Sequence, residues 1–161
     1  MAFLVGLVLG VVFVSPFVLC YALFIRWIDR FEPEPWWLLS LAFFWGALFA
    51  TLGGGLSSAV GEGVAMAVTG APENADGIQA FGATVLAPVF EEGFKGLGVA
   101  IIAAISAMGV KELDGPLDGA IYGGMVGLGF TLTEDTLYVS SAFAESGVAG
   151  FVGLLFLRTV L

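Results

Sequence analysis

The chain has 161 residues, of which 59% are hydrophobic, and it carries 14 acidic against 5 basic residues for a formal net charge of −9. This acidity excludes nucleic acid as a partner, which needs a basic surface, and the apolar share exceeds the roughly half that is usual in soluble domains. The single cysteine excludes an intrachain disulfide, and the sequence contains no histidine, the commonest metal ligand and general base. We therefore expect an all-α, polytopic membrane helical bundle in the lipid bilayer, forming one domain over residues 1–161.

About five apolar runs are expected to form transmembrane helices; they cover residues 2–28, 35–60, 78–108, 117–143 and 148–161. Pro33 and Pro35 end the first of them, because proline cannot continue a helix, and Pro35 suits the first turn of the second. The last run has about 14 residues, whereas about 20 are needed to span a bilayer, so we expect this helix to continue in a longer chain.

The few basic residues predict the orientation. Arg26, Arg30 and Lys111 flank the turns after the first and third segments, Arg158 is assigned to the same side, and the loop 61–77 contains no basic residue. Since basic residues favour the cytoplasmic side, these turns are expected inside the cell. The N-terminus and the loop 61–77 are then expected outside.

Three charged residues, Glu91, Glu92 and Lys95, interrupt the third apolar run. A charge at membrane depth costs about 2.5–3.5 kcal/mol on insertion scales, so this cluster indicates function. Helical residues four apart are neighbours, which predicts a Glu91–Lys95 pair and leaves Glu92 to take up a proton or coordinate a cation. The alternative is a structural ion pair between helices, although such buried pairs rarely add stability.

The fourth run carries a second polar cluster, Asp118, Tyr122, Glu134, Asp135 and Tyr138. Asp118 lies at the expected helix start, where a capping role explains a carboxylate. Glu134 and Asp135 are expected at a depth similar to that of the acidic pair in the third run, and Tyr138 is spaced to hydrogen-bond Glu134. The alternative is an acidic pair that reaches water at the outer interface.

Small residues suggest how these two helices meet. Glycines form one small face on each of the two runs: Gly93, Gly96 and Gly98 on the third, and Gly119, Gly123 and Gly127 on the fourth. Small faces allow helices to approach closely in lipid, so we expect the two faces to pack together. Arg158 is expected either to pair with one of the acidic residues or to extend to the inner membrane face.

If both acidic pairs converge with Lys95, the site carries more negative charge than a low-dielectric interior tolerates. One solution is shared protons, which would let the carboxylates act as general acid and base on a water without any cofactor. The other is a divalent metal that activates the water, with Glu91, Glu92 and Glu134 as ligands. Zinc would be unusual with oxygen ligands alone and ordinary only with a downstream histidine.

Four motifs follow one another in an order typical of a known family: Asp29–Trp36 (DRFEPEPW), similar to D-R-x-E-P-E-P; Ala87–Lys95 (APVFEEGFK), similar to P-x-x-E-E-x-x-K; residues 117–130, similar to D-G-x-x-Y-G…G-L-G-F; and Glu134–Tyr138 (EDTLY), similar to E-N-x-x-Y. Together they resemble the PrsW family of intramembrane proteases, relatives of the CAAX-protease and bacteriocin-processing superfamily. The resemblance covers about residues 29–158, and Asp135 stands where the family has asparagine.

The resemblance implies peptide-bond hydrolysis at the plasma membrane of a prokaryote, with membrane-anchored single-pass proteins such as anti-sigma factors as substrates. It implies that Glu91 and Glu92 are the catalytic pair, assisted by Lys95 and Glu134; the supporting residues are Asp118, Tyr122, Asp135, Tyr138 and Arg158. In the family, a histidine on a helix after the element matched by Leu157-Arg158 completes the site.

This chain lacks that histidine. Two other functions therefore stay open at this point: a catalytically inactive membrane scaffold or pseudo-protease, and a proton or cation conductor that uses the same buried carboxylates. The sequence leaves the oligomeric state open.

Overall fold

The structure is a computed structural model that describes residues 1–70, 76–110 and 112–160. Within these ranges the chain is helical and contains no strand, which confirms the predicted all-α membrane bundle. The elements in chain order are α1 (Ala2–Ile28), α2 (Trp36–Phe44), the π-helical η1 (Trp45–Ala50), α3 (Thr51–Thr69), α4 (Asp76–Phe81), η2 (Gly82–Leu86), α5 (Ala87–Ile105), η3 (Ser106–Val110) and α6 (Pro116–Val160).

By length and composition, three of the described helical stretches can cross a membrane: Ala2–Ile28, Trp36–Thr69 and Pro116–Thr159. The second expected segment, 35–60, continues to Thr69, where Gly70 in the left-handed conformation (φ 66°) ends it. The fourth expected segment, 117–143, and the fifth, 148–161, as far as residue 160, belong to one element, α6. Its helical geometry breaks at Gly147 (φ 63°, ψ −147°), between the two expected segments.

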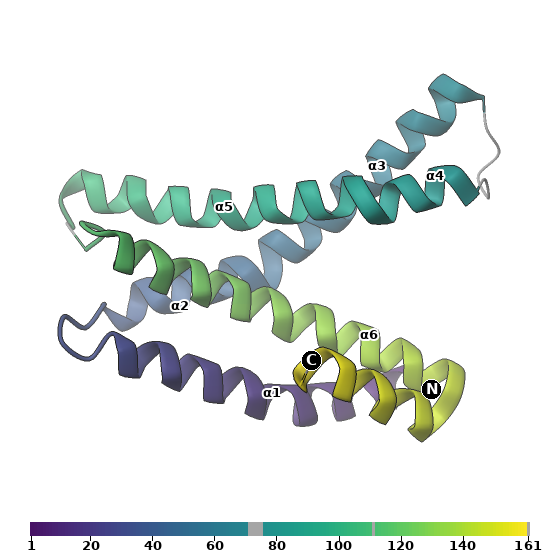
Figure 1. Cartoon of the computed structure of the whole chain (residues 1–161), viewed down its shortest axis with the longest axis horizontal. Coiled ribbons are helices and arrows are strands. Elements are labelled where there is room, and N and C mark those ends of the chain that lie inside the picture. Colours follow the sequence, from purple (N-terminus) through teal and green to yellow (C-terminus); the bar gives the residue numbers. More distant parts are fainter. Residues whose placement is uncertain (71–75, 111, 161) are drawn as a thin grey trace.

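Figure 1 shows α1, α5 and α6 running along the long axis of the bundle, with α3 leaning across them. The turn between α1 and α2 and the turn between α5 and α6 lie at one end. The bend within α6 lies at the other end, close to the N-terminus. After this bend the chain returns along α1, so its last residues lie beside the middle of the bundle (Figure 1).

One seam on α1 makes the contact with α6. Its buried residues, Gly6, Gly10, Val14 and Val18, recur every four positions and therefore share one helix face. A Cβ atom at Gly6 would lie 2.9 Å from the backbone of Ser140, so glycine is what allows the two helices this close. Large apolar side chains are exposed on the remaining faces of α1, as a lipid-facing helix requires.

The glycine faces that the sequence predicted to pack together do not do so, and that prediction was wrong. Among the described residues, nothing lies within 4 Å of a Cβ built at Gly93, Gly96, Gly119 or Gly127, and at Gly123 the nearest atom is 3.9 Å away. The close approaches use other glycines. Gly129 lies against the backbone of α2, and Gly98 accommodates the indole of Trp45, which also donates a 2.8 Å hydrogen bond to the carbonyl of Phe94.

Gly46 and Gly129 allow the α2–η1 region to pack closely against α6. A Cβ at Gly46 would lie 1.8 Å from the carbonyl oxygen of Val126, and a Cβ at Gly129 would lie 1.9 Å from that of Phe43. Gly46→Ala should therefore lower the free energy of unfolding by about 1–3 kcal/mol or more, because backbone must move. Thermal unfolding in detergent tests this against Gly63→Ala, which has open space; equal melting temperatures would contradict it.

Candidate functional site

A pocket of about 330 Å³ lies between α3, α5 and α6. Its lining residues come from three helices: Thr51, Gly55, Glu91, Phe130, Glu134, Leu137, Tyr138 and Ser141. The α6 members recur at three- and four-residue spacing and therefore share one helix face, and the two α3 members lie one turn apart. The pocket brings together three of the predicted site residues, Glu91, Glu134 and Tyr138.

Glycines in α3 allow α5 to present Glu91 at this pocket. A Cβ at Gly54 would lie 2.9 Å from the Cγ atom of Glu91, and a Cβ at Gly53 would lie 2.5 Å from the ring of Phe94. The side chains of α5 therefore rest directly on the backbone of α3. The position of Glu91 depends on a neighbouring helix that has no side chains at these two points.

Lys95 pairs with Glu92, so the predicted Glu91–Lys95 pair was wrong. The Lys95 Nζ to Glu92 Oε1 distance is 2.8 Å, with the Glu92 side chain 73% exposed. Helical residues three apart are neighbours just as those four apart are, so the spacing alone permitted either partner. The Lys95 ammonium also lies 3.7 Å from the ring centroid of Phe130. Among the described residues, Glu91 has no hydrogen bond or ion pair, so the carboxylate left over is Glu91.

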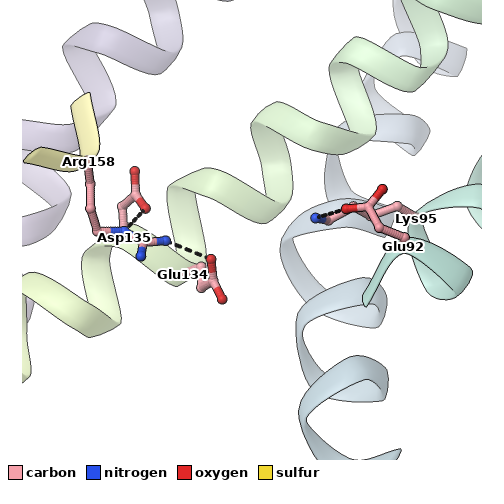
Figure 2. A network of polar contacts seen from close by, with 5 residues as sticks. All are labelled: Glu92, Lys95, Glu134, Asp135 and Arg158. Carbon is pink, nitrogen blue, oxygen red and sulfur yellow. Dashed lines mark hydrogen bonds and ion pairs between the residues drawn. The ribbon is translucent and has the colours of Figure 1, made fainter. Parts of the chain in front are cut away.

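Arg158 binds the second acidic pair, which confirms the first of the two alternatives for this residue. Its Nη2 atom lies 2.8 Å from Glu134 Oε2, and its Nε atom lies 2.5 Å from Asp135 Oδ1. Figure 2 shows one guanidinium between the two carboxylates, and the Lys95–Glu92 pair apart from them. The guanidinium also lies 4.3 Å from the ring centroid of Tyr138. The predicted Tyr138–Glu134 hydrogen bond is not found in the described part of the chain.

Comparison with known proteins decides the family. The family model described as PrsW family intramembrane metalloprotease matches residues 34–161. The chain belongs to the PrsW family. The match confirms the resemblance seen in the motifs, and with the apolar helices it makes the chain an integral membrane protein of an intramembrane protease family. No curated protein and no solved structure matches the chain.

The PrsW family is one of metalloproteases, and a metal ion needs several ligands that converge on one point. Of the predicted ligands, Glu91 and Glu134 line the pocket, while Glu92 points away and pairs with Lys95. Consecutive helical residues point about 100° apart, which explains why the two adjacent glutamates separate. The described residues contain no group of three or more acidic, cysteine or histidine side chains placed to hold a metal ion. A catalytic zinc site ordinarily has three protein ligands, so these residues alone do not complete one.

Two predicted supporting residues, Asp118 and Tyr122, lie near the start of α6, away from the pocket. At a rise of about 1.5 Å per residue, Tyr122 is roughly 18 Å along the helix from Glu134. Asp118 Oδ2 accepts hydrogen bonds from the backbone N–H groups of Asp114 (3.0 Å) and Gly115 (2.7 Å). Asp118 is the third residue of α6 and fastens the turn before the helix, so it is not the N-cap residue that the sequence predicted.

Tyr122 belongs to a buried polar network at the turn between α1 and α2. Its hydroxyl donates to Glu34 Oε2. Asp29 Oδ2 accepts from Arg26 Nη1 at 2.6 Å and from the backbone N–H of Glu34 at 2.9 Å, and Arg26 also donates to the Glu34 carbonyl at 2.8 Å. Asp29 and Glu34 are both buried. Asp29 and Glu34 both belong to the D-R-x-E-P-E-P motif, which can be recognised in the sequence. The sequence did not show that the partner of Glu34 is Tyr122 in α6.

This network predicts a pH-dependent stability. Burial raises the pKa of the Glu34 carboxyl above its ordinary value of 4.5, with the charges of Asp118, Asp29 and Glu112 adding to the rise and the Tyr122 hydrogen bond opposing it. The folded protein therefore binds this proton more tightly than the unfolded chain. Stability from this group is fully present below about pH 4.5 and is lost as the pH rises through the folded pKa.

Glu34→Gln keeps an acceptor for Tyr122 and removes the titration. The free energy of unfolding of the wild type, relative to this variant, should therefore fall as the pH rises from about 4 to 7. Thermal unfolding over this pH range measures it, with Glu32→Gln, an exposed neighbour, as the control. If the free energy of unfolding of the wild type, relative to Glu34→Gln, increases as the pH rises, the prediction is contradicted.

Proposed function

We propose that the chain hydrolyses peptide bonds in membrane-anchored protein substrates, of the kind of single-pass anti-sigma factors, in the plasma membrane of a prokaryote. The N-terminus would lie outside the cell. The observation that carries the proposal is that Glu91, which has no partner among the described residues, lines one pocket together with Glu134 from another helix. Membership of an intramembrane protease family supports the same function.

In the proposed reaction, the Glu91 carboxylate takes a proton from a water molecule in the pocket. The resulting hydroxide attacks the carbonyl carbon of the scissile peptide bond, the C–N bond breaks, and the protonated Glu91 returns its proton to the leaving amine. This cycle consumes one water and restores the carboxylate. General acid–base catalysis of this kind contributes about 10²–10⁴-fold in rate.

The remaining charged residues pair with one another and leave Glu91 without a partner among the described residues. Lys95 pairs with Glu92. Arg158 binds both Glu134 and Asp135 and offsets one of their two negative charges. Glu134 remains part of the pocket wall and would orient the water or the peptide bond from the side opposite α5.

Co-expression with a single-pass substrate tagged at both ends tests the proposal. The wild-type protein should produce two fragments with new termini within or next to the membrane segment, located by mass spectrometry. The Glu91→Gln/Glu134→Gln double variant, expressed to the same level, should leave the substrate intact. Equal amounts of fragments in both samples would contradict the proposal. An ion flux through liposomes that contain the wild type but not the double variant, without any cleavage of the substrate, would also contradict it.

A further inference from the structure

The wall of the pocket that α6 provides is fixed in place. Phe130 and Tyr138 each lie under a cation: the Lys95 ammonium is 3.7 Å from one ring centroid, and the Arg158 guanidinium is 4.3 Å from the other. Cation–π contacts of this kind favour the observed positions of the two rings. Both cations are themselves held by carboxylates, so this aromatic wall is anchored twice.

On the α3 side, the lining of the pocket contains few side-chain atoms. It consists of Thr51, whose hydroxyl turns back to donate to the carbonyl of Gly46 at 3.1 Å, and of Gly55 one turn later. Gly55 differs from its two neighbours in the Gly53–Gly55 run. A Cβ at Gly53 or Gly54 would collide with α5, whereas a Cβ at Gly55 meets nothing within 4 Å among the described residues. Helix packing therefore accounts for the first two glycines and leaves Gly55 without a packing reason.

We propose that Gly55 determines substrate specificity by setting how large a side chain the pocket accepts. The pocket places a carboxylate, Glu91, beside aromatic and aliphatic surface, so a peptide bond near Glu91 leaves a flanking apolar side chain against Phe130, Leu137 and Tyr138. Phe130 and Tyr138 line this space on α6, and Gly55 lines it on α3. This inference rests on the proposed function and adds to it a preference for a bulky apolar residue next to the cleaved bond.

A substrate panel tests the inference. The cleavage position in a single-pass substrate is located with the wild-type protein, and the flanking residues are then varied among alanine, valine, leucine and phenylalanine. The wild type should cleave the leucine and phenylalanine substrates best. Gly55→Val should lower the ratio of kcat/KM for phenylalanine over alanine by at least about tenfold, because methylene-sized changes in an apolar pocket discriminate by about 10–200-fold.

Gly63→Val is the matched control. It makes the same substitution on the same helix, also in open space, at a position outside the pocket lining, and it should keep the wild-type ratio. An unchanged ratio in Gly55→Val, or loss of cleavage of every substrate in that variant, would overturn the inference while leaving the proposed function intact. Absence of cleavage by the wild type would overturn the proposed function, and the inference with it.

Discussion

Glu91→Gln should slow peptide cleavage by about 10²–10⁴-fold, which is the usual contribution of a general base. Glutamine has nearly the same shape and keeps the packing against Gly54, but it cannot take a proton from water. The adjacent Glu92→Gln should change the rate by less than about fivefold, because its side chain lies outside the pocket lining and pairs with Lys95.

Initial cleavage rates of one purified substrate in liposomes would separate the two glutamates. The variants are isosteric and adjacent in sequence, so each serves as the control for the other. A larger loss in Glu92→Gln than in Glu91→Gln would show that the exposed glutamate performs the chemistry, and would contradict the assignment of the general base.

Arg158→Met should destabilise the fold by about 3 kcal/mol, the lower end of the cost of removing one partner from a buried ion pair. The Asp135 side chain is only 4% exposed, so it would be left as an uncompensated charge, while the Arg158 side chain is 30% exposed. Adding Asp135→Asn to Arg158→Met should recover most of the loss, because the buried charge is then removed as well.

Thermal unfolding of the three proteins in one detergent measures this effect, with Arg30→Met as a control for the loss of an exposed arginine. If the double variant is no more stable than Arg158→Met, the buried charge of Asp135 is not the cause. A melting temperature of Arg158→Met equal to that of the wild type would contradict the ion pair itself.

Local signals in the sequence were sufficient for the fold class and for two of the acidic residues that line the candidate pocket, Glu91 and Glu134. Long apolar runs separated by proline- and glycine-rich turns predict membrane helices, and Gly147 marks the break between the last two of these runs. Charged residues within apolar runs drew attention to Glu91 and Glu134 because charges at that depth are costly. Neither inference needs the tertiary structure.

The ion-pair and hydrogen-bond partners of these residues could not be predicted, because the sequence permits more than one partner for each residue. Lys95 has a glutamate both three and four residues before it, and helix geometry permits either pair. Tyr122 was assigned to the acidic site, yet it bonds to Glu34, which lies 88 residues earlier in the chain. The open space at Gly55 can be assigned to a pocket only because the structure shows that α3 and α6 line the same pocket.

The proposed reaction requires Glu91 and Glu134, which come from different helices, to act on one water in one pocket. A double-mutant cycle with Glu91→Gln and Glu134→Gln tests this requirement, with kcat/KM measured on a single substrate in liposomes. Residues that act as a unit give non-additive losses, so the double variant should be no slower than the worse single variant within about threefold. Losses that multiply, or wild-type cleavage by Glu134→Gln, would contradict this requirement.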